Sequence, residues 1–272
     1  MPIKARNTYP SNDTEKRYGN SIKKPLVSII TAVFNCERFL EQTITSVLNQ
    51  TYDRIEYIIV DGGSTDGTLD IIRNYQDHIS CWISESDNGV YDAWNKGIDL
   101  ANGQWISFIG SDDVFYNNAV ENYIQYIFQT GTPDLDYISS KAKLVDDDLK
   151  DLRTIGKHWE WKKFQKYNNL AHVGSFHSKR LFDKYGRYDC QYEIAGDYEF
   201  LIRAGIHLKA AFMDKITVKM RYSGISNSRK ALSETMHVKI NSGGRNRALS
   251  FLEYCFGSIK FVLKHLAVGI VN

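Results

Sequence analysis

Proline, paired cysteines and long uncharged apolar runs are all scarce in this sequence. Only 4 of the 272 residues are proline and 24% are charged, while 43% are hydrophobic. A disordered chain has the opposite bias, so the composition predicts a folded chain with a sizeable core. The four cysteines never occur at C-x-x-C spacing, which argues against a zinc knuckle or a disulfide framework and favours a reducing compartment. The alternative that Cys36 is a nucleophile has no base partner in the sequence.

An apolar signal core is also absent from the start of the chain. Residues 1–24 are polar, basic and rich in turn formers, so we expect a flexible leader and a cytoplasmic protein. The formal net charge is only +2, and no nucleic-acid partner is expected. The positive excess lies in residues 226–272, where seven Lys and Arg stand against two acids, Glu234 and Glu253.

The tail ends in a strongly apolar stretch, residues 251–271. Glu253, Lys260, Lys264 and His265 interrupt it, so no run reaches the roughly eighteen uncharged residues that a membrane-spanning helix needs. Aromatic and aliphatic bulk combined with lysines fits a helix that lies in the plane of a membrane surface. A helix packed on the protein itself, or on a second subunit in a homodimer, fits equally well.

The chain does contain a repeated pattern of β-rich segment, polar loop and helical segment. Residues 26–34 are β-rich and end at Asn35, after which apolar residues recur at helical spacing up to Leu48. Residues 55–60 lead through Asp61 and a Gly-rich turn into a short helix, and residues 78–84 lead into a helix over 90–101. A fourth strand follows at 106–109. Such repeats predict an α/β fold with a mostly parallel central sheet flanked by helices.

The fourth strand ends in Ser111, Asp112 and Asp113, which places two adjacent carboxylates just past a buried segment. The carboxyl ends of parallel strands form the ligand-binding edge of an open α/β sheet. Paired carboxylates there suit a hard divalent cation that bridges a diphosphate. Alternatively, these residues cap a helix over residues 114–128, because Ser and Asp are favoured N-caps.

Five motifs in order resemble those of the family-2 inverting glycosyltransferases of bacterial surface-polysaccharide type, which have the Rossmann-like GT-A fold. The motifs are residues 27–35 (VSIITAVFN), 59–68 (IVDGGSTDGT), 87–97 (DNGVYDAWNKG), 111–113 (SDD) and 195–203 (AGDYEFLIR). The resemblance implies a GT-A domain over residues 25–226. The leader at 1–24 then precedes it, and a basic amphipathic helical extension over 227–272 follows it.

The resemblance implies that the ends of the first two strands bind the nucleotide. Ala32, Phe34 and Asn35 would line the base, with Phe34 where many members have a stacking Tyr. Asp61 would read the base, through N3–H if the base is uracil. Many members carry Asp-Asp-Gly-Ser at this point, whereas this chain has Gly62 after Asp61, which removes one expected base contact.

The same resemblance assigns a metal motif to Ser111, Asp112 and Asp113, with Gly110 where many relatives have another Asp. Ser111 and Asp112 would contact the nucleotide, and Asp112 and Asp113 would hold Mn²⁺ or Mg²⁺ together with water and both phosphates. The ion would neutralise charge on the departing diphosphate. Arg221, which precedes a Gly-x-Ser stretch at 224–226, would approach the diphosphate, and a solvated arginine is the alternative.

The resemblance also implies the residues on the acceptor side. Asp197 matches the family's catalytic base, and inverting transfer needs one carboxylate that accepts the proton of the attacking hydroxyl. Glu199, at i, i+4 spacing from Arg203, is the alternative base. Between the metal motif and Asp197 lie aromatic residues suited to the faces of a sugar, and we predict acceptor contacts at His172 and Trp159.

The sequence thus predicts a metal-dependent inverting glycosyltransferase that moves a sugar from a nucleotide-diphosphate donor, with UDP first, to a hydroxyl of a growing glycan. If the tail binds the inner face of a membrane, the resemblance implies a lipid-linked acceptor of lipopolysaccharide or capsule biosynthesis. A sugar nucleotidyltransferase would share a similar fold but would carry a Gly-rich loop with Arg, which residues 29–35 lack. A catalytically silent nucleotide-sugar-binding subunit is the other alternative, and three retained carboxylates argue against it: Asp112, Asp113 and Asp197.

Overall fold

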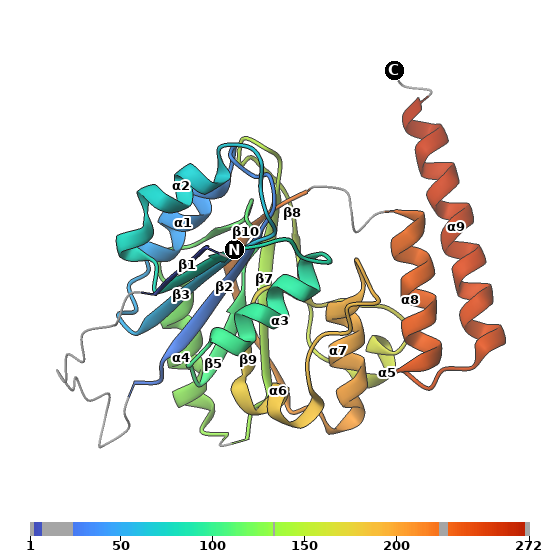
Figure 1. Ribbon diagram of the computed structural model, residues 1–272. Coiled ribbons are helices and arrows are strands. Elements are labelled where there is room, and N and C mark those ends of the chain that lie inside the picture. Colours follow the sequence, from blue (N-terminus) through green and yellow to red (C-terminus); the bar gives the residue numbers. More distant parts are fainter. Residues whose placement is uncertain (1–2, 7–23, 133, 223–227, 270–272) are drawn as a thin grey trace.

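A ten-stranded sheet forms the centre of the protein (Figure 1). The computed structural model describes residues 3–6, 24–132, 134–222 and 228–269, with the backbone alone for residues 3–6 and 264–269. The strands follow the order β1-β4-β3-β2-β5-β9-β7-β10-β6, and β8 pairs with β7 at the side. Their bounds are β1 (Ile3–Arg6), β2 (Val27–Val33), β3 (Ile55–Asp61), β4 (Cys81–Ser84), β5 (Trp105–Phe108), β6 (Val114–Phe115), β7 (Tyr137–Val145), β8 (Asp151–Ile155), β9 (Ala171–Ser178) and β10 (Ala210–Arg221).

The four strands predicted from the β-α repeats lie side by side in the order β4-β3-β2-β5, and all three of these pairings are parallel. The pairing of β7 with β10 is parallel as well, while β9 runs antiparallel to both β5 and β7. The α/β class and the parallel centre of the sheet are therefore confirmed.

Helices cover both faces of this sheet, which explains why its central strands are apolar on both sides. On β2, Ile29 packs into one core cluster and Ile30 into the other, because successive side chains of a strand point to opposite faces. Helices α1, α2 and α4 contribute to the first cluster, and α3, α6, α7 and α8 contribute to the second. The helices are α1 (Leu40–Leu48), α2 (Thr68–Asn74), α3 (Val90–Leu100), α4 (Ala119–Thr130), α5 (Trp161–Phe164), α6 (Lys179–Tyr185), α7 (Gly196–Ala204), α8 (Arg229–Asn241) and α9 (Arg247–Gly269).

The predicted helix over residues 114–128 is wrong at its start. Val114 and Phe115 form strand β6 against β10, and the N–H of Tyr116 donates to the carbonyl of Thr217 at 2.9 Å. This pairing uses the backbone groups that a helix would need, so α4 begins only at Ala119. The acidic residues at 112 and 113 therefore do not cap it, and the capping alternative is wrong.

The two ends of the chain add elements to this core. Residues 3–6 pair with β4 as strand β1, which differs from the flexible leader expected there, while the rest of residues 1–23 lies outside the described ranges. At the other end, α8 and α9 stand side by side, far from α1 and α2 (Figure 1). Within the described ranges, neither of these helices nor any other is long and apolar enough to cross a bilayer.

Candidate active site

The carboxyl ends of β2, β3 and β4 meet at one edge of the sheet, as their parallel registers require. Phe34, the first residue after β2, is 61% exposed there, and Ala32 is half-buried within the strand. Asn35 follows with a positive φ of 48°, and its backbone N–H donates to Ser64 Oγ at 2.8 Å. Its side-chain oxygen accepts the N–H of Thr65 at 2.9 Å. Two loops are thus tied together beside an exposed aromatic ring.

Asp61 holds the Gly-rich turn that follows β3. Its side chain is completely buried, and its carboxylate accepts the N–H groups of Gly63 at 3.0 Å and Ser64 at 3.1 Å. The hydroxyl of Ser84, at the end of β4, donates to the same oxygen at 2.6 Å. A base contact by Asp61 would have to share a carboxylate that these bonds already use, so its predicted contact with the base stays a prediction.

A second acid lies against this turn from the loop before α3. A Cβ added to Gly62 would come within 2.7 Å of Oδ2 of Asp87, so the Asp87 carboxylate fills the space that a side chain at position 62 would need. Its other oxygen accepts the N–H of Gly89 at 2.9 Å. Asp87 belongs to one of the sequence motifs, but nothing in the local pattern indicates that it reaches Gly62.

The acidic loop after β5 brings two carboxylates together. A Cβ on Gly110 would lie 2.6 Å from Oδ2 of Asp113 and 3.0 Å from Oδ1 of Asp112, so both groups converge over the glycine. Burial raises the pKa of Asp112, and burial together with the charge of Asp112 raises the pKa of Asp113 well above its ordinary value. Two adjacent carboxylates resist ionisation because their charges repel each other, and a bound cation would stabilise their ionised forms.

These two side chains fit a divalent cation in part. Carboxylate oxygens are the ligands that Mg²⁺ and Mn²⁺ prefer, and Asp112 is partly open to solvent while Asp113 is buried. Across the described residues, no group of three or more His, Cys, Asp or Glu could enclose a metal. An ion here would take its other ligands from a diphosphate and water, as Mg²⁺ commonly does.

Arg221 braces this loop from the end of β10. Its backbone N–H donates to Oδ1 of Asp113 at 2.9 Å, and its guanidinium donates to the carbonyl oxygen of Asp112. The same guanidinium reaches Gln42 Oε1 at 2.6 Å and stacks 4.2 Å from the Phe39 ring. With 3% exposure and these partners, it is not a solvated arginine. A contact with the diphosphate stays a prediction, and the Gly-x-Ser stretch at 224–226 lies outside the described residues.

Asp197 lies in the first turn of α7, where its carboxylate accepts the N–H of Tyr198 at 2.7 Å. Burial raises its pKa to about 6. The preceding Gly196 lies against the ring of Tyr91, and a Cβ there would come within 2.7 Å of that ring. The Tyr91 hydroxyl donates to the carbonyl of Ile194 at 2.7 Å, so α3 positions the start of α7.

The loop before Asp197 is held from its other side by α8. Glu234 is buried, and its carboxylate accepts three backbone N–H groups, from Glu193 at 3.1 Å, Ile194 at 2.8 Å and Ala195 at 2.9 Å. Sequence reasoning missed both Tyr91 and Glu234. Each acts over a long sequence separation. Tyr91 lies within the motif at residues 87–97, but that motif does not indicate a contact with Ile194, and Glu234 belongs to none of the five motifs.

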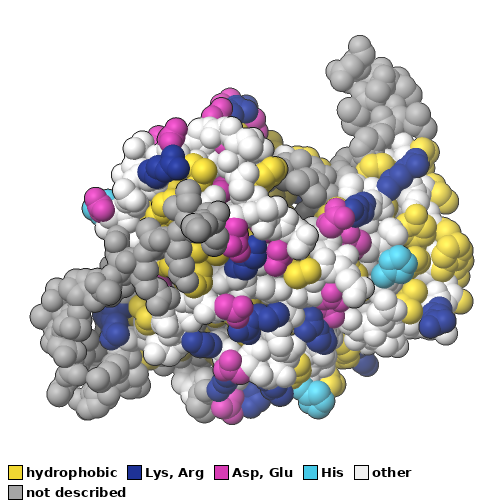
Figure 2. Space-filling model, viewed as in Figure 1, with side chains coloured by type: hydrophobic (Ala, Val, Ile, Leu, Met, Phe, Trp, Pro, Cys, Tyr) yellow, Lys and Arg dark blue, Asp and Glu magenta, His cyan; other side chains and the backbone are white. Residues whose placement is uncertain are grey.

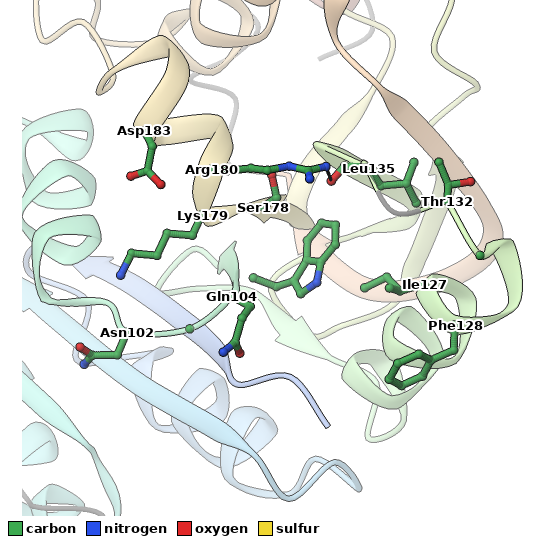
Figure 3. Close-up of a pocket in the computed structure, with 13 residues that line it drawn as sticks. Asn102, Gln104, Ile127, Phe128, Thr132, Leu135, Ser178, Lys179, Arg180 and Asp183 are labelled. Carbon is green, nitrogen blue, oxygen red and sulfur yellow. Dashed lines mark hydrogen bonds between the residues drawn. The ribbon is translucent and has the colours of Figure 1, made fainter. Parts of the chain in front are cut away.

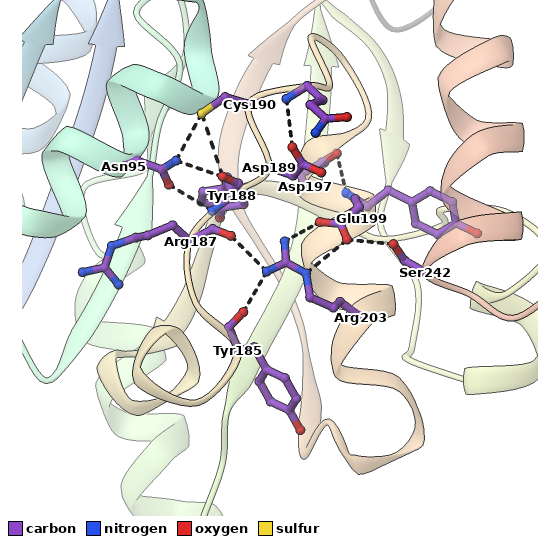
Figure 4. A network of polar contacts seen from close by, with 12 residues as sticks. Asn95, Tyr185, Arg187, Tyr188, Asp189, Cys190, Asp197, Glu199, Arg203 and Ser242 are labelled. Carbon is purple, nitrogen blue, oxygen red and sulfur yellow. Dashed lines mark hydrogen bonds and ion pairs between the residues drawn. The ribbon is translucent and has the colours of Figure 1, made fainter.

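Glu199, the alternative base, is engaged within the protein (Figure 4). It is 4% exposed. Its carboxylate accepts hydrogen bonds from Arg203 Nε at 3.1 Å and from the hydroxyl of Ser242 at 2.8 Å. Arg203 also donates to the carbonyls of Tyr185 at 2.7 Å and Arg187 at 3.0 Å. Glu199 therefore joins α7 to α8 and to the loop before α7, whereas Asp197 has one backbone partner and is partly exposed.

The two predicted acceptor residues lie in aromatic surroundings. His172 is 7% exposed, stacks 5.3 Å from Trp94, and lies 3.3 Å from the Tyr188 hydroxyl. Burial lowers its pKa to about 3, so the ring is neutral. Trp159 is half-buried against Phe164, with ring centroids 4.5 Å apart. A sugar could reach the open part of Trp159 more readily than His172, and both contacts stay predictions.

The remaining candidate, Cys36, lies close to the acidic loop. Its thiol donates to the carbonyl of Ser111 at 3.5 Å, and burial raises its pKa. A protonated, hydrogen-bonded thiol is a poor nucleophile.

A hollow of about 640 Å³ lies at the opposite edge of the sheet, near Trp105 at the start of β5 (Figure 3). Its cations are committed to the protein. Arg180 donates to the Leu135 carbonyl at 2.9 Å and to Asp136 at 3.3 Å, and Lys179 donates to the Ala101 carbonyl at 2.9 Å. The strand ends with Phe34 and Asp112 therefore remain the candidate site.

An α/β sheet with an acid pair at the carboxyl ends of its parallel strands fits a protein of the GT-A class. The chain belongs to the family described as "Glycosyl transferase family 2", whose sequence model matches residues 28–179. It is therefore a glycosyltransferase.

Curated relatives and solved structures agree with this assignment. A "PGL/p-HBAD biosynthesis glycosyltransferase" of Mycobacterium tuberculosis is 29% identical over 215 residues, which cover 75% of this chain and 80% of the relative. The "putative teichuronic acid biosynthesis glycosyltransferase TuaG" of Bacillus subtilis is 33% identical over 151 residues, 49% of this chain and 60% of the relative.

Among solved structures, S. aureus TarS 1–349 in complex with UDP superposes with a TM-score of 0.60 at 18% identity, covering 89% of this chain and 72% of the 1–349 chain. The mannosyltransferase PcManGT from Pyrobaculum calidifontis, in complex with GDP-Man and Mn²⁺, gives 0.61 at 13% identity, covering 91% and 80%. At these identities the likeness establishes the fold.

Proposed function

We propose that this glycosyltransferase transfers a sugar, with inversion, from a UDP-sugar to a hydroxyl of a growing bacterial surface glycan, and that it uses Mn²⁺ or Mg²⁺. The observation that carries the proposal is the convergence of the Asp112 and Asp113 carboxylates over Gly110 at the carboxyl end of β5. The complexes of TarS with UDP and of PcManGT with GDP-Man and Mn²⁺ support a nucleotide-sugar donor and a divalent cation. The relatives named for teichuronic acid and PGL biosynthesis support a cell-surface glycan as acceptor.

In this proposal the donor lies along the strand ends. Phe34 is exposed and can stack on the base, and the bonded loops of Asn35 and Ser64 fix its position. Asp112 and Asp113 would hold the cation, and Arg221 keeps their loop in place. When bound, the cation supplies positive charge to the leaving diphosphate.

Asp197 acts on the acceptor. The acceptor oxygen attacks the anomeric carbon of the donor sugar, the bond from that carbon to the diphosphate oxygen breaks, and the hydroxyl proton passes to the Asp197 carboxylate. A pKa of about 6 leaves this carboxylate ionised at neutral pH and more basic than an ordinary aspartate, as general-base catalysis requires. A partly exposed Trp159 is the proposed contact for the acceptor sugar.

A donor panel tests this function. Thermal unfolding is measured with UDP-, GDP- and dTDP-sugars, each with Mn²⁺, with Mg²⁺ and with chelator. Binding stabilises the protein by RT ln(1 + [L]/Kd), about 2.7 kcal/mol at a hundredfold excess over Kd. We expect stabilisation by a UDP-sugar that requires the metal. Stabilisation by another nucleotide alone would reassign the donor, and equal binding with chelator would contradict metal dependence.

The stereochemical outcome is tested on the product. The anomeric configuration of the transferred sugar, measured by NMR coupling constants, should be opposite to that in the donor. A product with retained configuration contradicts the single displacement. Metal-dependent donor binding with no transfer to any glycan acceptor would favour a silent nucleotide-sugar-binding subunit.

A further inference from the structure

Helix α9 carries a broad apolar face that the rest of the described protein does not cover. Five aliphatic and two aromatic side chains along it are between 37% and 64% exposed: Leu249, Phe251, Leu252, Phe256, Ile259, Val262 and Leu263. Figure 2 shows hydrophobic side chains gathered at the edge of the molecule where Figure 1 places α9. Exposed apolar surface of this extent marks an interaction site.

The opposite side of α9 packs on α8. The helix is therefore already docked on the protein through that side, and the exposed apolar face is a different one. Ser250 is 1% exposed, and a Cβ on Gly257 would lie 3.3 Å from Leu232 of α8. Glu253 pairs with Lys239 at 3.1 Å and with Arg245. The glycine and the ion pairs fix α9 against α8 and leave the apolar face pointing away from the protein.

The outer surface of the helix pair α8 and α9 carries more positive than negative charge. Both acids among the described residues of α8 and α9 already have partners: Glu234 is buried and accepts backbone N–H groups, and Glu253, whose side chain is 29% exposed, pairs with Lys239 and Arg245. Arg247 and Lys260 are exposed, and Lys260 Nζ lies 4.5 Å from the centre of the Phe256 ring. Among its described side chains, the outward surface is therefore apolar and basic, and it carries no unpaired carboxylate.

We infer that the outer face of α9 binds the surface of an anionic lipid bilayer, with the helix in the plane of the membrane. An apolar face bounded by cations inserts between acyl chains while its cations contact lipid phosphates. If two copies met through this same face, each would present an apolar and basic surface to the other, and Arg247 and Lys260 would find no free acid there to pair with. Charge complementarity therefore favours the lipid. This inference does not depend on which nucleotide sugar the enzyme uses.

The test is sedimentation with vesicles of equal parts phosphatidylglycerol and phosphatidylcholine, compared with pure phosphatidylcholine. The intact protein should sediment with the anionic vesicles. The double variant Leu252→Ser/Phe256→Ser should lose at least about tenfold in partitioning. The matched control, Leu152→Ser/Ile206→Ser, removes two side chains that are 54% and 70% exposed elsewhere and should bind as the wild type does.

Charge and oligomeric state separate the alternatives. Arg247→Gln and Lys260→Gln should each weaken binding to anionic vesicles about fivefold and leave UDP affinity unchanged. If the wild type ignores vesicles, or if Leu252→Ser/Phe256→Ser binds them fully, the inference is wrong. A wild-type dimer by light scattering that this variant converts to a monomer, without vesicle binding, would assign the face to a second copy.

Discussion

The carboxylate of Asp113 accepts the backbone N–H of Arg221 at 2.9 Å, and the guanidinium of Arg221 donates in return to the carbonyl of Asp112. Arg221, the last residue of β10, is thus bonded to the acidic loop at both of its aspartates. Asp113 is 4% exposed and Asp112 is partly open, so the two carboxylates differ in their surroundings although they are adjacent in sequence.

This arrangement predicts the effect of removing each charge. Asp112→Asn and Asp113→Asn should each weaken metal-dependent UDP binding about tenfold or more, because each removes a carboxylate from the converging pair. An asparagine at 113 can still accept the Arg221 N–H through its amide oxygen, so the fold should survive. Calorimetric titration of UDP with and without Mn²⁺ measures the loss. Asp183→Asn, an exposed acid at the opposite edge, is the control. Unchanged Mn²⁺-dependent affinity in both variants would remove the metal assignment.

The second prediction separates the two carboxylates of α7. Asp197→Asn keeps the shape of the side chain but cannot accept a proton, so transfer should fall by about a hundred- to ten-thousandfold while UDP affinity holds. Glu199→Gln weakens its bonds to Arg203 and Ser242 and should cost about 1–3 kcal/mol of unfolding free energy, with the transfer rate of folded enzyme largely kept. Single-turnover rates and thermal unfolding of both variants decide between them. Transfer by Asp197→Asn within about threefold of wild type would return the role to Glu199.

The third prediction is a pH profile. Burial raises the pKa of Asp197 to about 6, and only the ionised form can accept a proton. The single-turnover rate should therefore fall about tenfold per pH unit below pH 6 and level off above it. The effect on stability has the opposite sign. Folding raises the pKa of this carboxyl, so its contribution to the free energy of unfolding is present below pH 3.8, the ordinary pKa, and is lost as the pH rises towards 6. In Asp197→Asn the inflection of the rate near pH 6 should vanish, and the loss of stability between pH 3.8 and 6 should become smaller, because the raised pKa values of Asp112 and Asp113 still contribute to it. A rate that keeps its inflection would indicate another base.

The fourth prediction concerns the base of the nucleotide. Phe34→Ala should weaken UDP binding about two- to tenfold, because aromatic stacking contributes about 0.5–1.5 kcal/mol, and should leave thermal stability unchanged since the ring is 61% exposed. Phe34→Tyr keeps an aromatic ring and should bind UDP with about the wild-type affinity. Tyr167→Ala, which removes a ring that is 50% exposed elsewhere, is the control. An affinity that does not respond to Phe34→Ala would place the base away from β2.

The sequence was sufficient for the parts of the fold that local pattern determines. Apolar runs of β2, β3 and β5 and the loops that follow them locate Phe34, Asp61 and Asp112 at one edge of a parallel sheet. It was insufficient where a distant strand competes for the backbone. Val114 and Phe115 carry no signal that distinguishes the start of a helix from a pairing with β10, which lies about a hundred residues further along the chain.

The contacts that position the site were equally inaccessible to local reasoning. Tyr91 reaches the carbonyl of Ile194 across 103 residues, and Asp87 fills the space over Gly62 from a different loop. Such partners depend on how helices dock on the sheet, and single residue types do not encode that docking. For the same reason, the hydrogen bonds that Asp61 and Arg221 make within the protein could be identified only from the folded structure.

The three backbone bonds accepted by Glu234 have a practical consequence for engineering. A catalytic fragment cut at residue 226 would retain Asp197 but lose the acid that holds the three residues two to four positions before it. Exchange of C-terminal hairpins between relatives would require an acid at the same place on the incoming helix. Substitutions on the outer surface of α9 leave the bonds of Glu234 in place, so this surface can be redesigned while the loop before Asp197 keeps its support.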